Sequence, residues 1–442
     1  MNLLPAARGL LPVRQTLRIG VTGLARAGKT VFLTSLAANL LAGGQGLPPA
    51  ARTRATIRLA PAGADDLPRF DYRAHVAALA ADPPHWPART DATALLALDI
   101  DIVRTGLTAA LPPRRLRLEL LDYPGEWLLD LPLLTLDFPA WSQRVLARLD
   151  REPAAAAFLT FLRGLPASAP ADDSLATAGH HLYRALLHTL RDRGLSLLQP
   201  GRFLMPRPGA EPPWIAFFPM PGSSPLARLL QERYAAYVQA VRRDLAAPSF
   251  GKVHRLVVLA DLLSALHTGA HAFADAAAAL DAVAKALRWQ QPTKYLPNWL
   301  TPLFGGIDRV AFAVTKSDHI AERQRGNLAA LIRCLTQTPG DAATKSFALA
   351  SIRCTEDFVW TLDDDQGRGR PVSAVRGRVE NQGLVGSYPG EVPDTPPGPD
   401  FWAHPFLAIP DFQPPRLPLG ARGGIPQINL DALLAFLLED YL

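Results

Sequence analysis

The chain has 442 residues, of which 48% are hydrophobic and 19% charged, with a formal net charge of +6 and two cysteines. This length exceeds a usual single domain, so we expect a core domain with a large insertion or two domains. Cys334 and Cys354 are too few for a disulfide framework, and no signal sequence opens the chain, so a reducing cytoplasm fits best. Because no uncharged apolar run reaches about 18 residues, we expect no membrane-spanning helix.

Positive charge is concentrated in the first part of the chain. Residues 1–64 contain eight Arg or Lys and no acidic residue, which leaves the rest of the chain with a net charge of −2. Such a local positive potential favours an anionic ligand, with scattered solvated arginines as the alternative. We expect no nucleic-acid partner, because the arginines are not interleaved with stacking aromatic residues.

The first motif lies between a predicted strand and a predicted helix. Residues 17–21 alternate as in a strand, and from Thr30 apolar residues recur at helical spacing up to residue 42. The sequence between them, Gly23-x4-Gly28-Lys29-Thr30, matches a P-loop, with a plain turn as the alternative. In a P-loop, backbone N–H groups surround the phosphates, the lysine reaches the β and γ phosphates, and the hydroxyl ligates Mg²⁺. The expected nucleotide contacts are Gly23, Ala25, Arg26, Ala27, Gly28, Lys29, Thr30 and Val31.

A hairpin is predicted next. Residues 95–103 alternate and are joined to the strand 116–122 by a Pro-rich loop, an arrangement typical of Ras-like rather than most ATPase folds. The loop before this hairpin should give Mg²⁺ a hydroxyl ligand, for which Thr90 is preferred and Thr93 is the second choice. Arg89 is a candidate arginine finger that would stabilise charge on the γ phosphate.

The second motif, Asp-x-x-Gly, follows this hairpin. Asp122 ends the strand and would hold Mg²⁺ through a water, while the Gly125 N–H would sense the γ phosphate; a plain turn is the alternative. Glu126 stands where Ras-like enzymes commonly carry the glutamine that orients the attacking water. Either Glu126 acts as a general base, or it swings away and hydrolysis is slow.

The third motif concerns the base. The strand 309–314 runs into Thr315-Lys316-Ser317-Asp318, and an ionised Asp318 matches the two adjacent donors of guanine, whereas adenine presents an acceptor at N1. The Lys316 stem would lie along the ring. The apolar stretch 346–351 ends at Ala350 and Ser351, where a backbone N–H would meet guanine O6; an ordinary core strand is the alternative.

The spacing of the motifs predicts an insertion. Asp122 and Asp318 are 196 residues apart, more than one or two α/β units need, and helical periodicity marks 141–165, 180–194 and 225–247. The helix 271–289 is expected to pack on the sheet, residues 363–370 to turn a hairpin, and a capped helix to begin at Asn429. We therefore predict four parts: a first part of a P-loop GTPase domain (1–130), a helical insertion (131–250), a second part of that domain (251–357) and a carboxyl-terminal extension packed on the core (358–442).

With these motifs the sequence resembles the YcjX-like family of bacterial P-loop GTPases, described as stress-associated. The resemblance covers nearly the whole chain and includes the stretches VTGLARAGKT, DPPHWPART, DYPGEWLLDLPLL, QPGRFLMP, VTKSDH, YPGEVP and LDALLAFLLEDYL. It implies an α/β, Ras-like P-loop domain with a mixed, mostly parallel sheet, interrupted by a helical insertion, and GTPase activity.

We therefore predict a protein that binds GTP and GDP with Mg²⁺ and hydrolyses GTP slowly, as a switch in a bacterial stress-related process. The alternatives are a guanine-nucleotide-binding scaffold with negligible hydrolysis and an ATP-dependent P-loop enzyme. Residues 1–18 motivate a peripheral contact with the inner membrane or with a membrane protein, although Pro5 and Pro12 interrupt any amphipathic helix there. The sequence names no regulatory protein partner.

Overall fold

The computed structural model describes residues 15–44, 47, 49–61, 67–88, 93–105, 109–110, 112–206, 211–246, 253–288, 307–337, 343–363, 369–404, 406–417 and 424–441. The chain divides into two compact units. The first unit contains Met1–Tyr123, Lys252–Phe273 and Gly306–Leu442, and the second contains Pro124–Gly251 and Ala274–Gly305.

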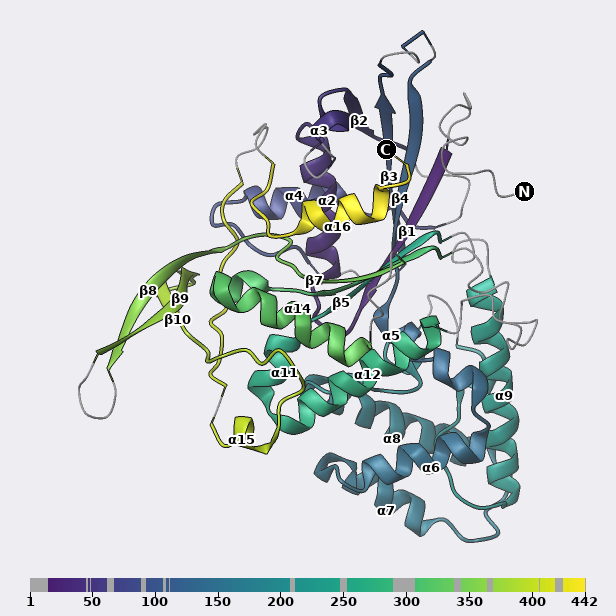
Figure 1. Ribbon diagram of the computed structural model, residues 1–442. Helices are drawn as coiled ribbons and strands as arrows, with labels where there is room; N and C mark the ends of the chain where they lie inside the picture. Colours follow the sequence, from purple (N-terminus) through teal and green to yellow (C-terminus); the bar gives the residue numbers. More distant parts are fainter. Residues whose placement is uncertain are drawn as a thin grey trace. The chain divides into compact units, whose positions relative to one another are not determined.

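A seven-stranded mixed sheet forms the centre of the first unit (Figure 1). Its strands, in spatial order, are β2 (Ala55–Leu59), β3 (Ala94–Ile102), β4 (Arg114–Asp122), β1 (Gln15–Gly23), β5 (Arg255–Ala260), β6 (Arg309–Val314) and β7 (Thr344–Ala348). The strands from β4 to β7 are parallel to one another, whereas β3 is antiparallel to β4 and β2 to β3. The predicted α/β class with a mixed, mostly parallel sheet is confirmed, and so is the antiparallel hairpin before Asp122.

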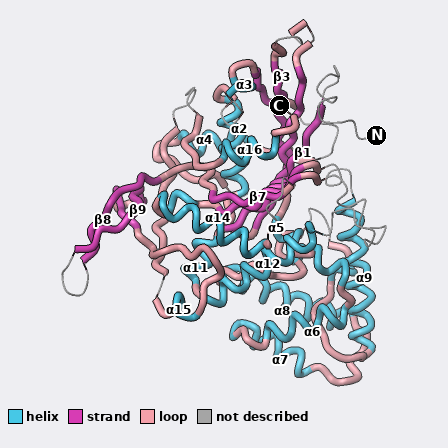
Figure 2. Tube along the Cα trace, in the orientation of Figure 1, coloured by secondary structure: helices cyan, strands magenta, loops and turns pink. Residues whose placement is uncertain are grey.

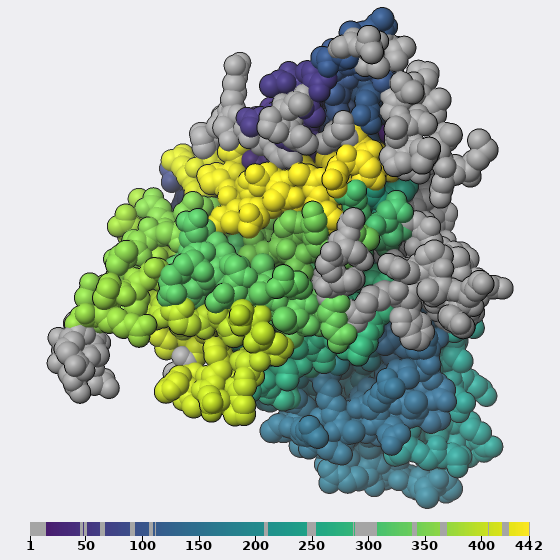
Figure 3. Space-filling model, viewed as in Figure 1, coloured from purple at the N-terminus to yellow at the C-terminus, as the bar shows by residue number. Residues whose placement is uncertain are grey.

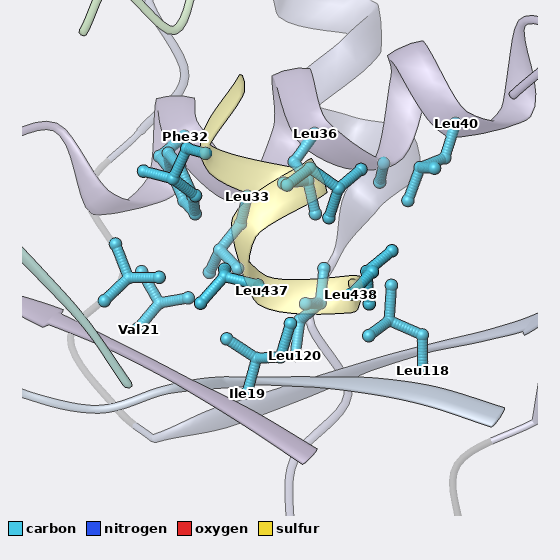
Figure 4. Close-up of a cluster of buried hydrophobic side chains, with 14 of the residues drawn as sticks. Ile19, Val21, Phe32, Leu33, Leu36, Leu40, Leu118, Leu120, Leu437 and Leu438 are labelled. Atoms are coloured by element: carbon cyan, nitrogen blue, oxygen red, sulfur yellow. The ribbon is translucent and has the colours of Figure 1, made fainter. Parts of the chain in front are cut away.

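The main core of this unit lies between the sheet and two helices that are far apart in sequence. Alternate residues of β1 and β4 point to one face, where they meet α2 (Lys29–Leu41) and α16 (Leu430–Leu438). Figure 4 shows Leu437 and Leu438 of α16 among side chains from α2, β1 and β4. In Figure 3 other residues of this yellow carboxyl-terminal segment are visible at the surface, so α16 covers the core from outside.

Further helices complete the first unit. They are α3 (Pro49–Arg52), α4 (Tyr72–Ala80), α11 (Leu262–Thr268), the 3-10 helix η6 (Ser317–His319), α14 (Glu322–Thr336) and α15 (Pro399–Trp402). Of these, α4 packs against α2, and α14 packs against β6 and β7.

A buried arginine fixes the carboxyl-terminal helix to β5. The Arg255 side chain is fully buried, donates to Asp440 at 2.6 Å and to Asp308 at 2.8 Å, and lies over the Tyr441 ring. The amino terminus of α16 is capped, but not by the side chain of Asn429. The Gln427 side chain accepts from the Leu430 N–H at 2.7 Å instead. The Asn429 amide donates to the Ala348 carbonyl of β7 at 2.8 Å, which is why it is not free to cap the helix.

A second, three-stranded antiparallel sheet belongs to the same unit. It consists of β8 (Thr355–Asp363), β9 (Gly369–Val379) and β10 (Gly383–Ser387), with β9 in the middle (Figure 1). Figure 2 shows β8 and β9 among the strands drawn in magenta. The antiparallel pairing of β8 and β9 begins next to the turn, where Asp363 lies opposite Gly369. The predicted hairpin at 363–370 is therefore confirmed, and its tip at 364–368 lies outside the described residues.

The second unit is mainly helical. Its elements are α5 (Gly125–Leu128), η2 (Leu131–Thr135), α6 (Phe138–Leu149), η3 (Pro153–Ala155), α7 (Ala156–Gly164), α8 (Asp173–Asp192), η4 (Gly201–Phe203), η5 (Pro213–Ile215), α9 (Pro225–Ala246) and most of α12 (Ala270–Arg288). Aromatic rings fill its core, where Trp141 stacks on Tyr234 and meets Phe217 edge-on. The helix predicted from residue 180 begins at Asp173, because the Asp172 carboxylate caps it by accepting from the Leu175 N–H at 2.8 Å.

Helix α12 differs from the prediction that it packs on the sheet. From Ala274 onward it belongs to the second unit. The Asp275 carboxylate accepts from the Leu197 N–H at 2.9 Å and pairs with Arg148. A buried carboxylate needs such partners, and within the second unit these side chains and N–H groups supply them. Among the described helices, none has both the length and the apolar character that crossing a bilayer demands.

The packing of α16 gives a first prediction. Leu437 is fully buried in the main core, so Leu437→Ala should lower the free energy of unfolding by about 2–5 kcal/mol in urea titrations. Leu407, which is 55% exposed in the same unit, is the control, and Leu407→Ala should change stability by less than about 0.5 kcal/mol. Equal stabilities of the two variants would mean that α16 does not belong to the core.

Candidate functional site

The predicted P-loop joins the end of β1 to the start of α2. A Cβ atom at Gly23 would lie 2.3 Å from the Leu259 carbonyl oxygen of β5, so only glycine fits there. The Leu24 N–H donates to the same carbonyl at 3.0 Å. Arg26 and Gly28 have φ angles of 62° and 77°, and these left-handed residues curl the loop before the helix begins.

This loop presents backbone donors at the amino terminus of α2. In the part of the chain that the structure describes, no hydrogen bond uses the N–H groups of Ala25, Arg26, Gly28 or Lys29. The Lys29 ammonium donates to the Gly23 carbonyl across the loop at 3.4 Å. Free N–H groups, a helix amino terminus and an ammonium group together suit a phosphate.

Asp122 ends β4 next to the P-loop strand. It is paired with Val21 of β1, and the Tyr123 N–H continues the ladder to the Val21 carbonyl at 2.9 Å. On its other side Asp122 is paired with Ala94, the first residue of β3. Thr93, the second choice for the Mg²⁺ ligand, comes directly before Ala94 in the chain. The preferred ligand Thr90 and the candidate finger Arg89 lie outside the described residues.

A pocket of about 260 Å³ brings three of the predicted motifs together within the first unit. The P-loop contributes Ala27, Gly28 and Val31; the Thr-Lys-Ser-Asp segment contributes Thr315, Lys316 and Asp318; and the end of the 346–351 stretch contributes Ala350 and Ser351. Five further residues that the sequence did not predict also line it: Trp86, His319, Ile352, Asp411 and Phe412.

Asp318 is buried at the pocket wall, where it is 1% exposed. Its Oδ2 accepts from the Cys354 N–H at 2.9 Å and from the Cys354 thiol at 3.0 Å. Burial, and then the Asp318 charge, raise the pKa of Cys354 far above that of a free thiol. The thiol is therefore a donor to Asp318 over the whole physiological range.

Lys316 and Thr315 are held by the neighbouring strand. The Thr315 N–H donates to the Ala260 carbonyl at the end of β5 at 2.9 Å. Lys316 has a left-handed backbone, with φ 60°, and its ammonium pairs with Asp261 at 2.5 Å. Lys316 thus lines the pocket with its ammonium held by Asp261.

The turn at Ala350 corrects one detail of the predicted base contact. The Ala350 N–H donates to the Ile428 carbonyl at 3.1 Å, and the Ile428 N–H donates back at 2.9 Å. Ala350 therefore lines the pocket with its N–H already bonded, which leaves the Ser351 N–H as the predicted donor to guanine O6. The Ser35 hydroxyl of α2 donates to the Ser351 carbonyl and ties this turn to the P-loop helix.

Two of the missed residues, Asp411 and Phe412, come from a segment with no local motif. The Trp86 indole N–H donates to the Phe412 carbonyl at 3.0 Å, and Phe412 meets His319 edge-on with the ring centroids 5.2 Å apart. Phe412 also bridges to Val379 of β9. A contact across more than three hundred residues leaves no periodic signal in the sequence, so only the folded chain reveals it.

Gly125 and Glu126 belong to the second unit, in α5. Within that unit, a Cβ at Gly201 would lie 1.7 Å from the Glu126 carbonyl oxygen, so the loop 199–206 packs directly on this turn. The fully buried Asp130 accepts from the Gly201 N–H at 2.7 Å and from the Tyr237 hydroxyl at 2.5 Å. Burial raises the pKa of Asp130 to about 6, although the Arg202 charge and these hydrogen bonds lower it.

A model of the YcjX-like family, DUF463, matches residues 17–442. The chain belongs to the YcjX-like family. A Ras-like GTPase YcjX from Escherichia coli (strain K12) is 32% identical to this chain over 460 residues, which cover 97% of each protein. A Ras-like GTPase YcjX from Shewanella oneidensis is 32% identical over 467 residues, which cover 96% of this chain and 94% of that relative. The family resemblance predicted from the motifs is confirmed.

The contrast between the two cysteines gives a second prediction. Cys334 is exposed, whereas the pKa of Cys354 is raised, so little of Cys354 is the reactive thiolate at pH 7.5. Iodoacetamide should therefore label the Cys334→Ser variant, which retains Cys354, at least about tenfold more slowly than the Cys354→Ser variant. Labelling of both variants at one rate, measured by mass spectrometry on folded protein, would contradict the contact between Cys354 and Asp318.

Proposed function

We propose that this protein binds GTP and GDP with Mg²⁺ and hydrolyses GTP to GDP and phosphate as a nucleotide-dependent switch. The observation that carries the proposal is the pocket, which is lined by the P-loop, by Thr315, Lys316 and Asp318, and by Ala350 and Ser351. The names of the two relatives, Ras-like GTPases, support it. The proposed organisation is a Ras-like domain (1–130 and 251–357), a helical insertion (131–250) and a carboxyl-terminal extension (358–442).

The choice of guanine rests on the charge of Asp318. Guanine offers N1–H and an exocyclic amine to a carboxylate, whereas adenine offers a lone pair at N1, which a carboxylate repels. An ionised group that is 1% exposed and left facing a lone pair is costly, so ATP should bind much more weakly. A guanine-nucleotide-binding protein is therefore favoured over an ATP-dependent enzyme.

The residues near the P-loop fit Mg²⁺ by their donor chemistry. The Thr30 hydroxyl in the first turn of α2 and the Asp122 carboxylate at the end of β4 are hard oxygen donors, which Mg²⁺ prefers. A threonine hydroxyl from the segment before β3, Thr90 or Thr93, would join them. When bound, Mg²⁺ neutralises charge on the β- and γ-phosphate oxygens. Lys29 and the loop N–H groups would bind and orient the same phosphates.

The hydrolytic step is assigned to Glu126, with Arg89 as the candidate arginine finger and the Gly125 N–H as the γ-phosphate sensor. Glu126 would orient and deprotonate the attacking water. In α5 this residue is only 4% exposed, which also favours the second candidate function, a guanine-nucleotide-binding scaffold with negligible hydrolysis. Single-turnover phosphate release by purified protein separates the two functions.

The cellular part of the proposal follows the family resemblance. It places the switch in a bacterial stress-related process in the cytoplasm, with a peripheral contact to the inner membrane or to a membrane protein through residues 1–18. Flotation with vesicles of anionic and zwitterionic lipids tests that contact, and recovery of all protein from the bottom fraction would remove it from the proposal.

Base recognition gives a third prediction. Asp318→Asn replaces an acceptor oxygen by an amide donor, so GDP affinity should fall by about 100-fold or more. Titration calorimetry with GDP measures the change.

The matched control is Asp431→Asn, an exposed carboxylate in the first turn of α16. This variant should bind GDP as the wild type does. The guanine assignment is wrong if Asp318→Asn keeps wild-type affinity for GDP, or if ATP displaces a labelled guanine nucleotide as well as GTP does.

The role of Glu126 gives a fourth prediction. Glu126→Gln keeps the shape of the side chain but removes the base, so single-turnover GTP cleavage should change by about tenfold or more while GTP affinity stays within a few fold. Unchanged cleavage would take Glu126 out of the mechanism.

A further inference from the structure

Asp318 does not offer both carboxylate oxygens to a base. A carboxylate oxygen has two lone-pair sites, and the Cys354 N–H and thiol occupy both sites of Oδ2, at 2.9 Å and 3.0 Å. Oδ1 lies 4.0 Å from the His319 Nε2, beyond hydrogen-bond distance. The side chain therefore presents one open oxygen, Oδ1, to the pocket.

Guanine presents two adjacent donors side by side, and these are best matched by two acceptor atoms. Its ring edge carries N1–H and, beside it, an amine with two hydrogens. If Oδ1 accepts from N1–H, the amine is left facing a saturated Oδ2. An unmatched donor that is partly withdrawn from water costs binding free energy, so a second acceptor on the pocket wall would raise both affinity and selectivity.

Asp411 is the other carboxylate among the pocket-lining residues. In the described part of the chain its carboxylate makes no hydrogen bond and no ion pair, in contrast to Asp261, which is paired with Lys316. Asp411, Asp318 and His319 line the same pocket, and Phe412, the neighbour of Asp411, meets the His319 ring edge-on with the ring centroids 5.2 Å apart. Burial lowers the pKa of His319, and the charges of Asp318 and Asp411 act to raise it.

The backbone around Asp411 is fixed on three sides. The Phe412 carbonyl accepts from the Trp86 indole at 3.0 Å, the Gln413 N–H donates to the Arg378 carbonyl at 2.8 Å, and the Phe412 ring is buried. A Cβ at Gly377 would lie 2.6 Å from that ring, so β9 leaves just enough room for it. This packing fixes the backbone that carries Asp411, whose exposed side chain is accessible to a ligand in the pocket.

This inference rests on the proposed guanine site. The geometry points to Asp411 as the second base acceptor: it accepts from the exocyclic amine of guanine, while Asp318 Oδ1 accepts from N1–H. The carboxyl-terminal segment 406–417 is then part of the base-specificity site. In this role Asp411 distinguishes purines that carry a 2-amino group from those that lack it. The Thr-Lys-Ser-Asp segment alone does not make that distinction in full.

The test compares GDP with inosine diphosphate, which lacks the amine and is otherwise identical. Titration calorimetry on the full-length chain with Mg²⁺ should show that the wild type prefers GDP by about tenfold or more. In Asp411→Ala that preference should fall to about twofold, through weaker GDP binding with inosine diphosphate affinity unchanged. Asp411→Asn, whose amide oxygen still accepts, should recover part of the preference.

Asp400→Ala is the matched control, because Asp400 is an exposed acid of the same carboxyl-terminal region in α15 and does not line the pocket. It should keep the wild-type preference. An unchanged preference in Asp411→Ala, or an equal loss for both nucleotides, overturns the role of Asp411 and leaves the proposed function standing. Failure of the wild type to bind either nucleotide overturns the proposed function itself. Thermal melts of each variant establish that it is folded.

Discussion

The parallel pairing of β4, β1, β5 and β6 places the carboxyl ends of four strands at one edge of the sheet. At that edge the chain continues from Gly23, Asp122, Ala260 and Val314 into the groups that we assign to the nucleotide or to their support. Ligands of open α/β sheets bind at such an edge, because loops from several strands converge there. The sheet register thus brings together motifs that are hundreds of residues apart, and the loops need only supply donors and acceptors of the right kind.

The carboxyl-terminal segment is built into this edge. Ile428 pairs with Ala350, the Ile425 N–H donates to the Asn39 side chain of α2 at 2.9 Å, and α16 fills the core beneath α2. The pocket wall and the core therefore share one stretch of chain. Loss of this segment would remove the support of the pocket wall and core packing together, so binding of any ligand in the pocket and the stability of the first unit are expected to be thermodynamically linked.

The sequence analysis identified strands and motifs where local patterns report them. The alternation of apolar residues in β1, β3 and β4 results from burial of one face of each strand. The glycines, lysine and carboxylates at the strand ends follow from phosphate chemistry, and both causes act over a few residues. It missed Trp86, Asp411 and Phe412, whose positions depend on contacts between distant segments. It also offered Ala350 as a donor, because the pairing that consumes its N–H comes from Ile428, which no local pattern reveals.

The turn after Asp122 is held by the packing of the second unit and is not a free loop. Gly201 lies against the Glu126 backbone, Trp127 donates to the Met205 carbonyl at 2.9 Å, and Asp130 is bonded to Gly201 and Tyr237. Asp130 is fully buried, so pulling it from these donors would leave an unpaired polar group. A rearrangement of Gly125 and Glu126 must therefore carry the loop 199–206 and α9 with it or break this network. In a switch, that cost would make the helical unit responsive to the state of the turn.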